Sequence, residues 1–460
     1  MSNFPKAFLD QMQELFVEEE FKAFFSSLET VSPVSLRYNP YKKTEMPTEF
    51  ESVPWASRAF YLKERPNFTA DPLIHAGGYY VQEASSMFLE QALKQHGKLE
   101  CQLRVLDLCA APGGKSTLIS ALLNEESLLL SNEVIKSRAH ILAENIQKWG
   151  QANIWVSQND PLEIGKVLPA FFDIIVVDAP CSGEGMFRKA EHSIGEWSLQ
   201  AVQHCALRQQ RILHDIWKAL RPGGILIYST CTYNVSENEK NLLKFREDCD
   251  FNSLKIEFAE DWKITETNQD DLYAYRFYPH KTKGEGFFLS VLQKAGDSAV
   301  TTPRVKKTNL NKAAKETEQL KNWCSDPDKY QLGQKNETIK VVPLHLWQEA
   351  QVLESLLNIV YGGAELAELN RKGFSPLPAA ALWTGLNQGA FTCADLELET
   401  ALTYLRQDNL PIDKAEQKDG WQLIRYKGLG LGWIKKLQNR VNNYFPKEWR
   451  IRMSMDKLTQ

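Results

Sequence analysis

Two of the eight cysteines lie in short loops whose sequences suit a reactive thiol. Cys181 stands in D-A-P-C-S-G (178–183), and Cys231 stands in Y-S-T-C-T-Y (228–233). Each loop directly follows an apolar run that predicts a buried strand, and in a doubly wound sheet such strand ends face the ligand crevice. If the two strands are neighbours, both thiols point into one site. Two unrelated buried cysteines are the alternative, which the turn-forming residues around each thiol disfavour.

A pair of thiols at one site suits covalent catalysis on a pyrimidine ring. Carbon 5 of cytosine is a poor nucleophile, but a thiolate that adds to carbon 6 makes carbon 5 electron-rich enough to attack a methyl sulfonium. The route also needs a group that handles the proton on N3 and a base that removes the hydrogen from carbon 5. A free thiol has a pKa of about 8.5, so positive charge or amide donors must lower it, and Lys115 is a candidate. The target nucleotide must also be unstacked.

The stretch D-L-C-A-A-P-G-G-K-S (107–116) predicts a ligand-binding turn between a strand and a helix. Small residues let the backbone approach a ligand closely, and the helix start offers free amide donors. The stretch is not a P-loop, because Cys109 holds the position, five residues before Gly114, at which that motif needs glycine. The dinucleotide fingerprint G-x-G-x-x-G is absent as well. A tight turn without a ligand is the alternative.

Acidic residues at the ends of the following strands favour a nucleoside ligand at this turn. Glu133 lies just past the second strand, where a carboxylate can accept hydrogen bonds from both ribose hydroxyls. Asp160 follows the third strand and could accept from an adenine amino group, and Asp178 ends the fourth strand. Carboxylates also suit a positively charged sulfonium better than a pyrophosphate. Each acid alone is better explained as a helix cap or surface residue, but their joint placement predicts nucleoside binding.

The elements that must position these residues follow an α/β pattern from about residue 76 to 296. Short apolar runs alternate there with helical patterns, which predicts a mostly parallel sheet with crossover helices. The candidate strands are 103–108, 128–130, 154–156, 171–177 and 224–228. Helical spacing is also expected in the opening segment and at 344–357, whereas the Pro-rich stretch 31–72 is expected to be irregular.

The length of 460 residues suggests about three domains. We expect a small N-terminal RNA-binding-type domain, an α/β domain, a polar linker, a middle C-terminal domain and a last domain rich in Gly and Trp. Their boundaries are 1–75, 76–296, 297–325, 326–388 and 389–460.

The composition is that of an ordinary soluble protein, with 43% hydrophobic and 24% charged residues. No signal peptide is visible, and no apolar run approaches the roughly 18 residues that a membrane span needs, so we expect a cytoplasmic protein that binds no membrane. The cysteines include no C-x-x-C pair, so no metal site is expected.

The net charge of −4 argues mildly against a nucleic-acid partner, but the charge is unevenly distributed. Eight basic residues and one acid lie between Arg425 and Arg452. Such a local surplus can bind phosphates, and a solvated helical face is the alternative. Aromatic residues lie among these basic residues, where they could stack on RNA bases or fill a small β-rich core. They are Trp421, Tyr426, Trp433, Tyr444 and Trp449.

Four motifs in this order resemble the RsmB/RsmF and NOP/SUN group of RNA cytosine-C5 methyltransferases. They are G-G-Y-Y-V-Q-E-A-S-S-M (77–87), A-A-P-G-G-K (110–115), D-A-P-C-S-G and S-T-C-T. The resemblance implies a Rossmann-like class I methyltransferase fold with S-adenosylmethionine as cofactor. It implies that Cys231 is the nucleophile, that Cys181 assists elimination and release of the RNA, and that Asp178 contacts the cytosine near N3. The implied cofactor residues are Cys109, Ala110, Ala111, Pro112, Gly113, Gly114, Lys115, Glu133, Asp160 and Asp178.

Two stretches of the tail resemble the bacterial RsmF branch of this group. They are G-L-G-L-G-W-I-K-K (428–436) and Y-F-P-K-E-W-R (444–450). The resemblance implies a PUA-like RNA-binding domain at 389–460 and a substrate in small-subunit (16S) ribosomal RNA near the decoding site. The implied partner is ribosomal RNA or the 30S subunit, with no obligate protein partner. Asn443, Tyr444, Phe445 and Glu448 depart from the usual family tail, which leaves the RNA target open.

Other functions explain less of the sequence. A transfer-RNA cytosine-C5 methyltransferase would share the chemistry with another substrate. A non-catalytic RNA-binding or ribosome-assembly factor would have no use for both cysteines. A DNA cytosine methyltransferase would place its nucleophile in the Pro-Cys loop and leave the Ser-Thr-Cys loop unexplained.

Overall fold

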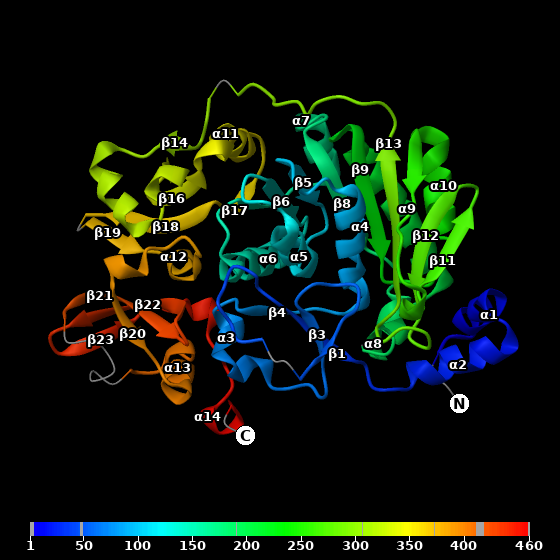
Figure 1. Ribbon diagram of the computed structural model, residues 1–460, viewed down its shortest axis with the longest axis horizontal. Helices are drawn as coiled ribbons and strands as arrows, with labels where there is room; N and C mark the ends of the chain where they lie inside the picture. Colours follow the sequence, from blue (N-terminus) through cyan, green and yellow to red (C-terminus); the bar gives the residue numbers. More distant parts are fainter. Residues whose placement is uncertain are drawn as a thin grey trace.

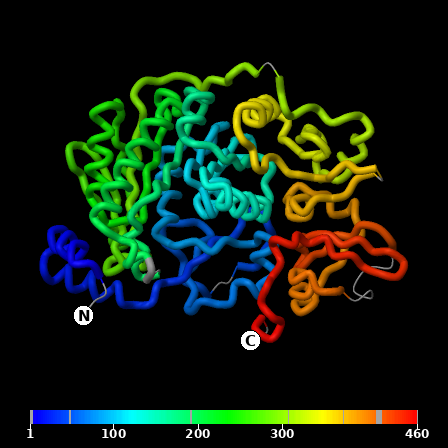
Figure 2. Tube along the Cα trace, turned by 180° about the vertical axis from the view of Figure 1, so that it is seen from behind, coloured from blue at the N-terminus to red at the C-terminus, as the bar shows by residue number. Residues whose placement is uncertain are grey.

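The computed structural model describes residues 4–46, 49–189, 191–305, 307–371, 373–410 and 418–458. Four sheets lie along the molecule, with helices α1 and α2 at one end and the last sheet at the other (Figure 1). Seen from behind, the C-terminal segment lies beside the segment that precedes the central sheet (Figure 2). None of the described helices is long and apolar enough to cross a membrane.

The central sheet has ten strands in the order β11-β12-β13-β9-β8-β5-β6-β7-β17, with β10 paired to β13. Its middle five strands, β9 to β7 in that order, pair in parallel, as expected from the alternating pattern. The strands are β5 (Arg104–Asp107), β6 (Leu128–Asn132), β7 (Ile154–Ser157), β8 (Phe172–Asp178), β9 (Leu220–Thr230), β10 (Phe251–Leu254), β11 (Thr265–Gln269), β12 (Leu272–Phe277), β13 (Phe287–Lys294) and β17 (Ile359–Gly362).

Helices cover both faces of this sheet, because apolar side chains leave the parallel strands on both sides. Val105 and Val176 pack in one core with residues of α4, α5 and α6, whereas Leu106 and Val177 pack in the other with residues of α7, α9 and α10. The helices are α4 (Leu89–His96), α5 (Gly114–Leu122), α6 (Lys136–Trp149), α7 (Pro161–Val167), α8 (Glu191–Glu196), α9 (Leu199–Trp217) and α10 (Glu239–Asp248).

The N-terminal part contains two helices and a four-stranded sheet in the order β2-β3-β1-β4. Three of these strands lie in the stretch 31–72, so the irregular structure expected there is wrong. The alternation of apolar and polar residues that usually reveals a strand is missing in β1, because the polar residues Ser35 and Arg37 are buried. Ser35 bonds to Gln82, and Arg37 bonds to Gln82 and Thr117. The elements are α1 (Lys6–Leu15), α2 (Glu18–Leu28), β1 (Val34–Tyr38), β2 (Glu51–Ser52), β3 (Ala59–Leu62), η1 (Phe68–Ala70), α3 (Pro72–His75) and β4 (Tyr79–Val81).

The C-terminal part contains a five-stranded sheet, β14-β15-β16-β18-β19, and a four-stranded sheet, β20-β21-β22-β23. The helix expected at 344–357 is η7 (Leu344–Leu346) followed by α11 (Trp347–Leu356). The other elements are β14 (Asn311–Lys312), η5 (Lys315–Trp323), η6 (Pro327–Lys329), β15 (Tyr330–Lys335), β16 (Thr338–Pro343), β18 (Ala364–Asn370), β19 (Gly373–Pro376), α12 (Pro378–Leu382), β20 (Thr392–Asp395), α13 (Leu398–Leu405), β21 (Gly420–Tyr426), β22 (Leu429–Leu437), β23 (Arg440–Asn443) and α14 (Met455–Leu458).

The domain boundaries expected from the sequence stay a prediction. Three features of the structure bear on them. Strand β4 pairs with β1, so the first sheet runs past residue 75. Part of the stretch 297–325, expected to be a linker, is folded, because β14 and η5 lie within it and the side chains of Leu310 and Leu320 are buried. Strand β17 belongs to the middle C-terminal segment, but it pairs antiparallel with β7 of the central sheet.

Candidate active site

The thiols of Cys181 and Cys231 lie together at the carboxyl ends of two neighbouring parallel strands. Strand β8 pairs with β9, and Asp178 is opposite Ser229 at the ends of these strands. The sulfur atoms of Cys181 and Cys231 are 3.2 Å apart, within hydrogen-bond contact. The folded sheet therefore brings together two residues that are 50 positions apart in the chain.

Both thiols line a cavity of about 210 Å³. Seven of the residues singled out in the sequence line it: Cys109, Ala111, Glu133, Asp160, Asp178, Cys181 and Cys231. Ala110, Pro112, Gly113, Gly114 and Lys115 are not among the lining residues, but they form or follow the turn that shapes one wall. The strand ends thus gather three carboxylates and three thiols around one space.

The turn after β5 has the backbone that its small residues suggested. Gly113 has a φ of +118° and precedes the first turn of α5. A Cβ atom there would lie 3.3 Å from a methyl carbon of Leu142, so both conformation and space favour glycine. The side chain of Arg138 donates to the carbonyl of Ala111 at 2.9 Å and lies 3.3 Å from the carboxylate of Glu133.

Asp178 is held between two donors at the edge of the cavity. Its carboxylate lies 2.8 Å from the ammonium group of Lys115, and the hydroxyl of Ser229 donates to its other oxygen at 2.8 Å. Burial alone would lower the pKa of Lys115, but the charge and hydrogen bond of Asp178, together with nearby Asp107 and Cys231, outweigh burial and raise that pKa. Lys115 is therefore a fixed cation, and Asp178, rather than a thiol, is its direct partner.

Glu133 and Asp160 both reach the cavity while also stabilising the local chain. The backbone N–H of Ile135 donates to Glu133 at 2.9 Å, and the side chain of Glu133 is buried. Asp160 caps α7, where it accepts from the N–H of Leu162 at 3.0 Å. The helix-cap explanation is thus correct for Asp160, and its place in the cavity lining is an additional property.

Glu237 is a site residue that the sequence reasoning missed. Its buried carboxylate accepts hydrogen bonds from the backbone N–H and the hydroxyl of Ser182, and from the amide of Gln209. Burial raises the pKa of Glu237 to about 7. It therefore ties the Cys181 loop to the chain that follows Cys231. The acid-rich run E-N-E at 237–239, six residues past Cys231, is the signal that could have indicated it.

Two of the three thiols that line the cavity have raised pKa values. The pKa of Cys181 is raised, first by its contact with Cys231 and then by burial. Cys109, which also lines the cavity, has a raised pKa because it is buried beside carboxylates. Cys181 and Cys109 are therefore neutral thiols at neutral pH. Among the described residues, no group of three or more His, Cys, Asp or Glu side chains could hold a metal ion.

Family models match three parts of the chain. Residues 95–293 match the 16S rRNA methyltransferase RsmB/F model, residues 4–84 match the N-terminal domain of 16S rRNA methyltransferase RsmF, and residues 391–451 match the methyltransferase RsmF PUA domain. The ribosomal RNA small subunit methyltransferase F of Aeromonas salmonicida (strain A449) is 33% identical, over 87% of this chain and 85% of its own length. The chain belongs to the RsmB/F family of 16S rRNA methyltransferases.

Further comparisons agree with this assignment and with the fold. The ribosomal RNA small subunit methyltransferase F of Vibrio campbellii (strain ATCC BAA-1116) is 31% identical, over 96% of this chain and 97% of its own length. The crystal structure of a methyltransferase homolog from Pyrococcus horikoshii is 27% identical with a TM-score of 0.53, over 63% of this chain and 95% of its own. The family, the Rossmann-like fold and the RNA methyltransferase class expected from the sequence are confirmed.

S-adenosylmethionine is the cofactor of this RsmB/F methyltransferase, and the cavity suits it chemically. The cofactor carries a positive sulfonium and a nucleoside with hydroxyl and amino donors, and the cavity offers the carboxylates of Glu133, Asp160 and Asp178. Its wall at Ala111 is backbone from a tight turn, which lets a ligand approach closely.

Proposed function

We propose that this RsmB/F methyltransferase methylates carbon 5 of a cytosine in 16S rRNA, through a covalent bond between Cys231 and carbon 6. The observation that supports the proposal most strongly is the pair of thiols, with sulfur atoms 3.2 Å apart, in one cavity with Asp178. A single thiol would suffice for addition to the ring. A second thiol in contact with the first has a use when the covalent bond must also be broken.

In this reaction Cys231 is the nucleophile, Asp178 acts near N3 in addition to its place beside the cofactor, and Cys181 acts at the end. S-adenosylmethionine supplies the methyl group. The Cys231 thiolate adds to carbon 6, and the ring electrons move towards carbon 5 while Asp178 interacts near N3. After carbon 5 has gained the methyl group, a base takes its hydrogen as a proton, the double bond between carbons 5 and 6 re-forms, and Cys231 leaves as a thiolate. Cys181 assists this elimination and the release of the methylated RNA.

The remaining site residues hold the cofactor in this proposal. The backbone from Cys109 to Gly114 forms one wall, Glu133 accepts from the ribose, Asp160 accepts from the adenine, and Lys115 fixes Asp178. The charge of Lys115 is shared with Asp178 at 2.8 Å, so Lys115 orients that carboxylate in addition to contributing positive charge near the thiols.

A 16S rRNA substrate is supported by the family description and by the names of the relatives. The position of the target cytosine near the decoding site is the finer part of this proposal and comes from the resemblance of the tail to the RsmF branch. The activity then belongs in the cytoplasm, on ribosomal RNA or the 30S subunit.

Nucleoside analysis tests the proposal. The chain is incubated with S-adenosylmethionine and 30S subunits or 16S rRNA lacking the modification, with transfer RNA as a parallel substrate. We expect 5-methylcytidine in 16S rRNA, and its complete loss in Cys231→Ala. Cys101→Ala is the matched control, because Cys101 is exposed and lies outside the cavity. Methylation of another atom, or full activity of Cys231→Ala, contradicts the proposal.

A further inference from the structure

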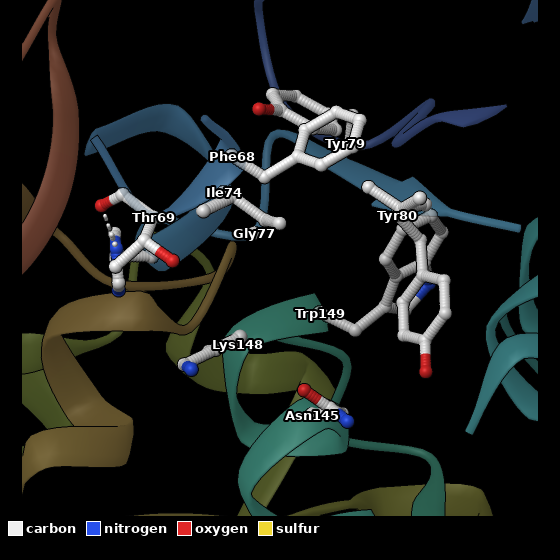
Figure 3. A pocket seen from close by; sticks show the side chains of 11 residues that line it. Phe68, Thr69, Ile74, Gly77, Tyr79, Tyr80, Asn145, Lys148 and Trp149 are labelled. Carbon is white, nitrogen blue, oxygen red and sulfur yellow. Dashed lines mark hydrogen bonds between the residues drawn. The ribbon is translucent and has the colours of Figure 1, made fainter. Parts of the chain in front are cut away.

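A second cavity, of about 300 Å³, lies between β4, the segment before it, and the end of α6 (Figure 3). Its walls come from the N-terminal sheet and from the methyltransferase domain. Phe68 and Tyr79 lie on one side, Asn145 and Lys148 lie on the opposite side, and Tyr80 and Trp149 close a third side. None of the active-site residues described above lines this cavity.

The lining of this aromatic cavity suits a flat ligand with polar edges. Four of its residues carry aromatic rings that offer faces or edges for contact, and the amide of Asn145 can both donate and accept. The lining residues include no carboxylate. Burial lowers the pKa of His75 to about 4, so this lining histidine is neutral at pH 7.

Two lining side chains also contact the cofactor turn. The side-chain amide of Asn145 donates to the carbonyl of Pro112 at 2.8 Å. The ring of Tyr80 packs against the turn so closely that a Cβ atom at Gly114 would lie 3.4 Å from it. A ligand in the aromatic cavity is therefore separated from the cofactor turn by one layer of side chains.

The C-terminal segment 447–452, here called the basic segment, approaches the aromatic cavity through Trp449. The ammonium group of Lys148, which pairs with Glu144, lies 5.5 Å from the centre of the Trp449 ring. Lys447, Arg450 and Arg452, next to Trp449, are exposed, and none of them forms an ion pair with any residue that the structure describes. Unpaired cations beside an aromatic cavity match a phosphodiester strand that carries a base.

We propose that the aromatic cavity binds one unstacked nucleobase of the RNA substrate, outside the target cytosine, while the basic segment holds the adjoining phosphates. The inference rests on the proposed RNA substrate and names a second contact with it. A volume of about 300 Å³ is at the lower end of the range for ligand cavities and has room for one base. Three domains would then bind one strand, which couples its position to the cofactor turn.

Binding of synthetic RNA tests this site independently of methylation. The probe is a single-stranded 16S rRNA fragment containing the target cytosine, and a series in which one nucleotide at a time is abasic. We expect one abasic position, away from the target, to weaken binding to the unmodified protein by about 5- to 100-fold. Phe68→Ala is expected to weaken binding of the intact fragment to a similar degree, and to show no further loss at that abasic position.

Two further variants make the result decisive. Val81→Phe fills the cavity instead of emptying it, and it must reproduce the effect of Phe68→Ala. Phe374→Ala, a partly buried phenylalanine on β19, is the matched control and must bind like the unmodified protein. The inference is overturned if the abasic position weakens binding to Phe68→Ala as much as it weakens binding to the unmodified protein. It is also overturned if Phe68→Ala and Val81→Phe both bind the intact RNA like the unmodified protein. Absence of methyl transfer by the unmodified protein would instead contradict the proposed function and leave this binding result interpretable.

Discussion

Glu237 connects the two cysteine loops and also accepts from the amide of Gln209 on α9. It accepts from Ser182, one residue past Cys181, and it follows Cys231 by six positions. A carboxylate in this place fixes the distance between the two sulfur atoms, which act in sequence on one ring in the proposed reaction. Misplacing a reacting group by about 1 Å can cost about 10²-fold in rate.

We predict that Glu237→Ala lowers kcat for methyl transfer by about 10²-fold and leaves the Kd for S-adenosylmethionine nearly unchanged. Kinetics at saturating RNA, together with calorimetric titration of the cofactor, measure both quantities. Glu399→Ala serves as a control, because Glu399 is an acid in the first turn of α13, outside the cavity that holds the cysteines. If kcat of Glu237→Ala is within twofold of that of the unmodified protein, the carboxylate of Glu237 is not needed to position the cysteine loops.

The protonation of Glu237 predicts a pH dependence of stability. Burial raises its pKa from 4.5 to about 7, so the folded protein keeps a proton that the unfolded chain has lost between these pH values. The free energy of unfolding therefore falls as the pH rises from about 4.5 to 7, by about 3 kcal/mol for this one group.

Urea unfolding at several pH values checks this expectation with Glu237→Gln. In this variant the free energy of unfolding should no longer fall with pH through Glu237. It should still fall through Asp107, because burial also raises the pKa of Asp107 to about 7. Parallel curves for the two proteins would mean that Glu237 does not titrate in this range.

The helices and strands show where sequence patterns succeed and where they fail. The five parallel strands were predictable because both of their faces are apolar, and the cysteine loops followed from their ends. The strands within 31–72 were not predictable, because they are short and Arg37 is buried through bonds to Gln82 and Thr117. Those partners are 45 and 80 residues away, so no local pattern reveals them.

Strand β17 is a second element that no local pattern indicated. It comes from the middle C-terminal segment, yet it extends the central sheet beyond β7. Gly362 lies directly over the indole of Trp155, and a Cβ atom there would be 2.0 Å from that ring. The pairing thus depends on a residue without a side chain.

We predict that Gly362→Ala destabilises the protein by about 1 to 3 kcal/mol, because overpacking forces Trp155 or β17 to shift. The midpoint of urea unfolding measures the effect. Gly195→Ala is the matched control, since Gly195 is exposed in α8 and no atom lies within 4 Å of a Cβ added there. Equal midpoints for Gly362→Ala and the unmodified protein would contradict the packing described for β17.

Over the whole molecule, the net charge of −4 conceals a basic region. Of the eight basic residues from Arg425 to Arg452, Arg425 bonds to Asp395 and Lys436 lies 3.0 Å from Asp419, and the other six form no ion pair with residues that the structure describes. The sequence revealed the surplus, and only the fold revealed which cations are exposed. The aromatic residues of the tail also differ in exposure. Trp433 is fully buried and fills the core, whereas Tyr444 is exposed.

We predict that neutralising Lys447, Arg450 and Arg452 to Gln makes the salt dependence of RNA binding less steep. The slope of log Kd against log salt should fall by about 2, since each phosphate contact on a single strand contributes about 0.7. The control variant replaces Lys22, Lys94 and Lys329 with Gln, because these lysines already pair with acids. An unchanged slope in the tail variant would place the phosphate contacts elsewhere.

The central claim is that Cys231 bonds to the RNA and that Cys181 helps to break this bond. Incubation of Cys181→Ala with S-adenosylmethionine and 16S rRNA, followed by a denaturing gel, tests it most directly. We predict a retarded protein–RNA species that is absent from the unmodified protein and from Cys181→Ala combined with Cys231→Ala. A gel without that species, or an adduct that survives the loss of Cys231, would contradict the mechanism.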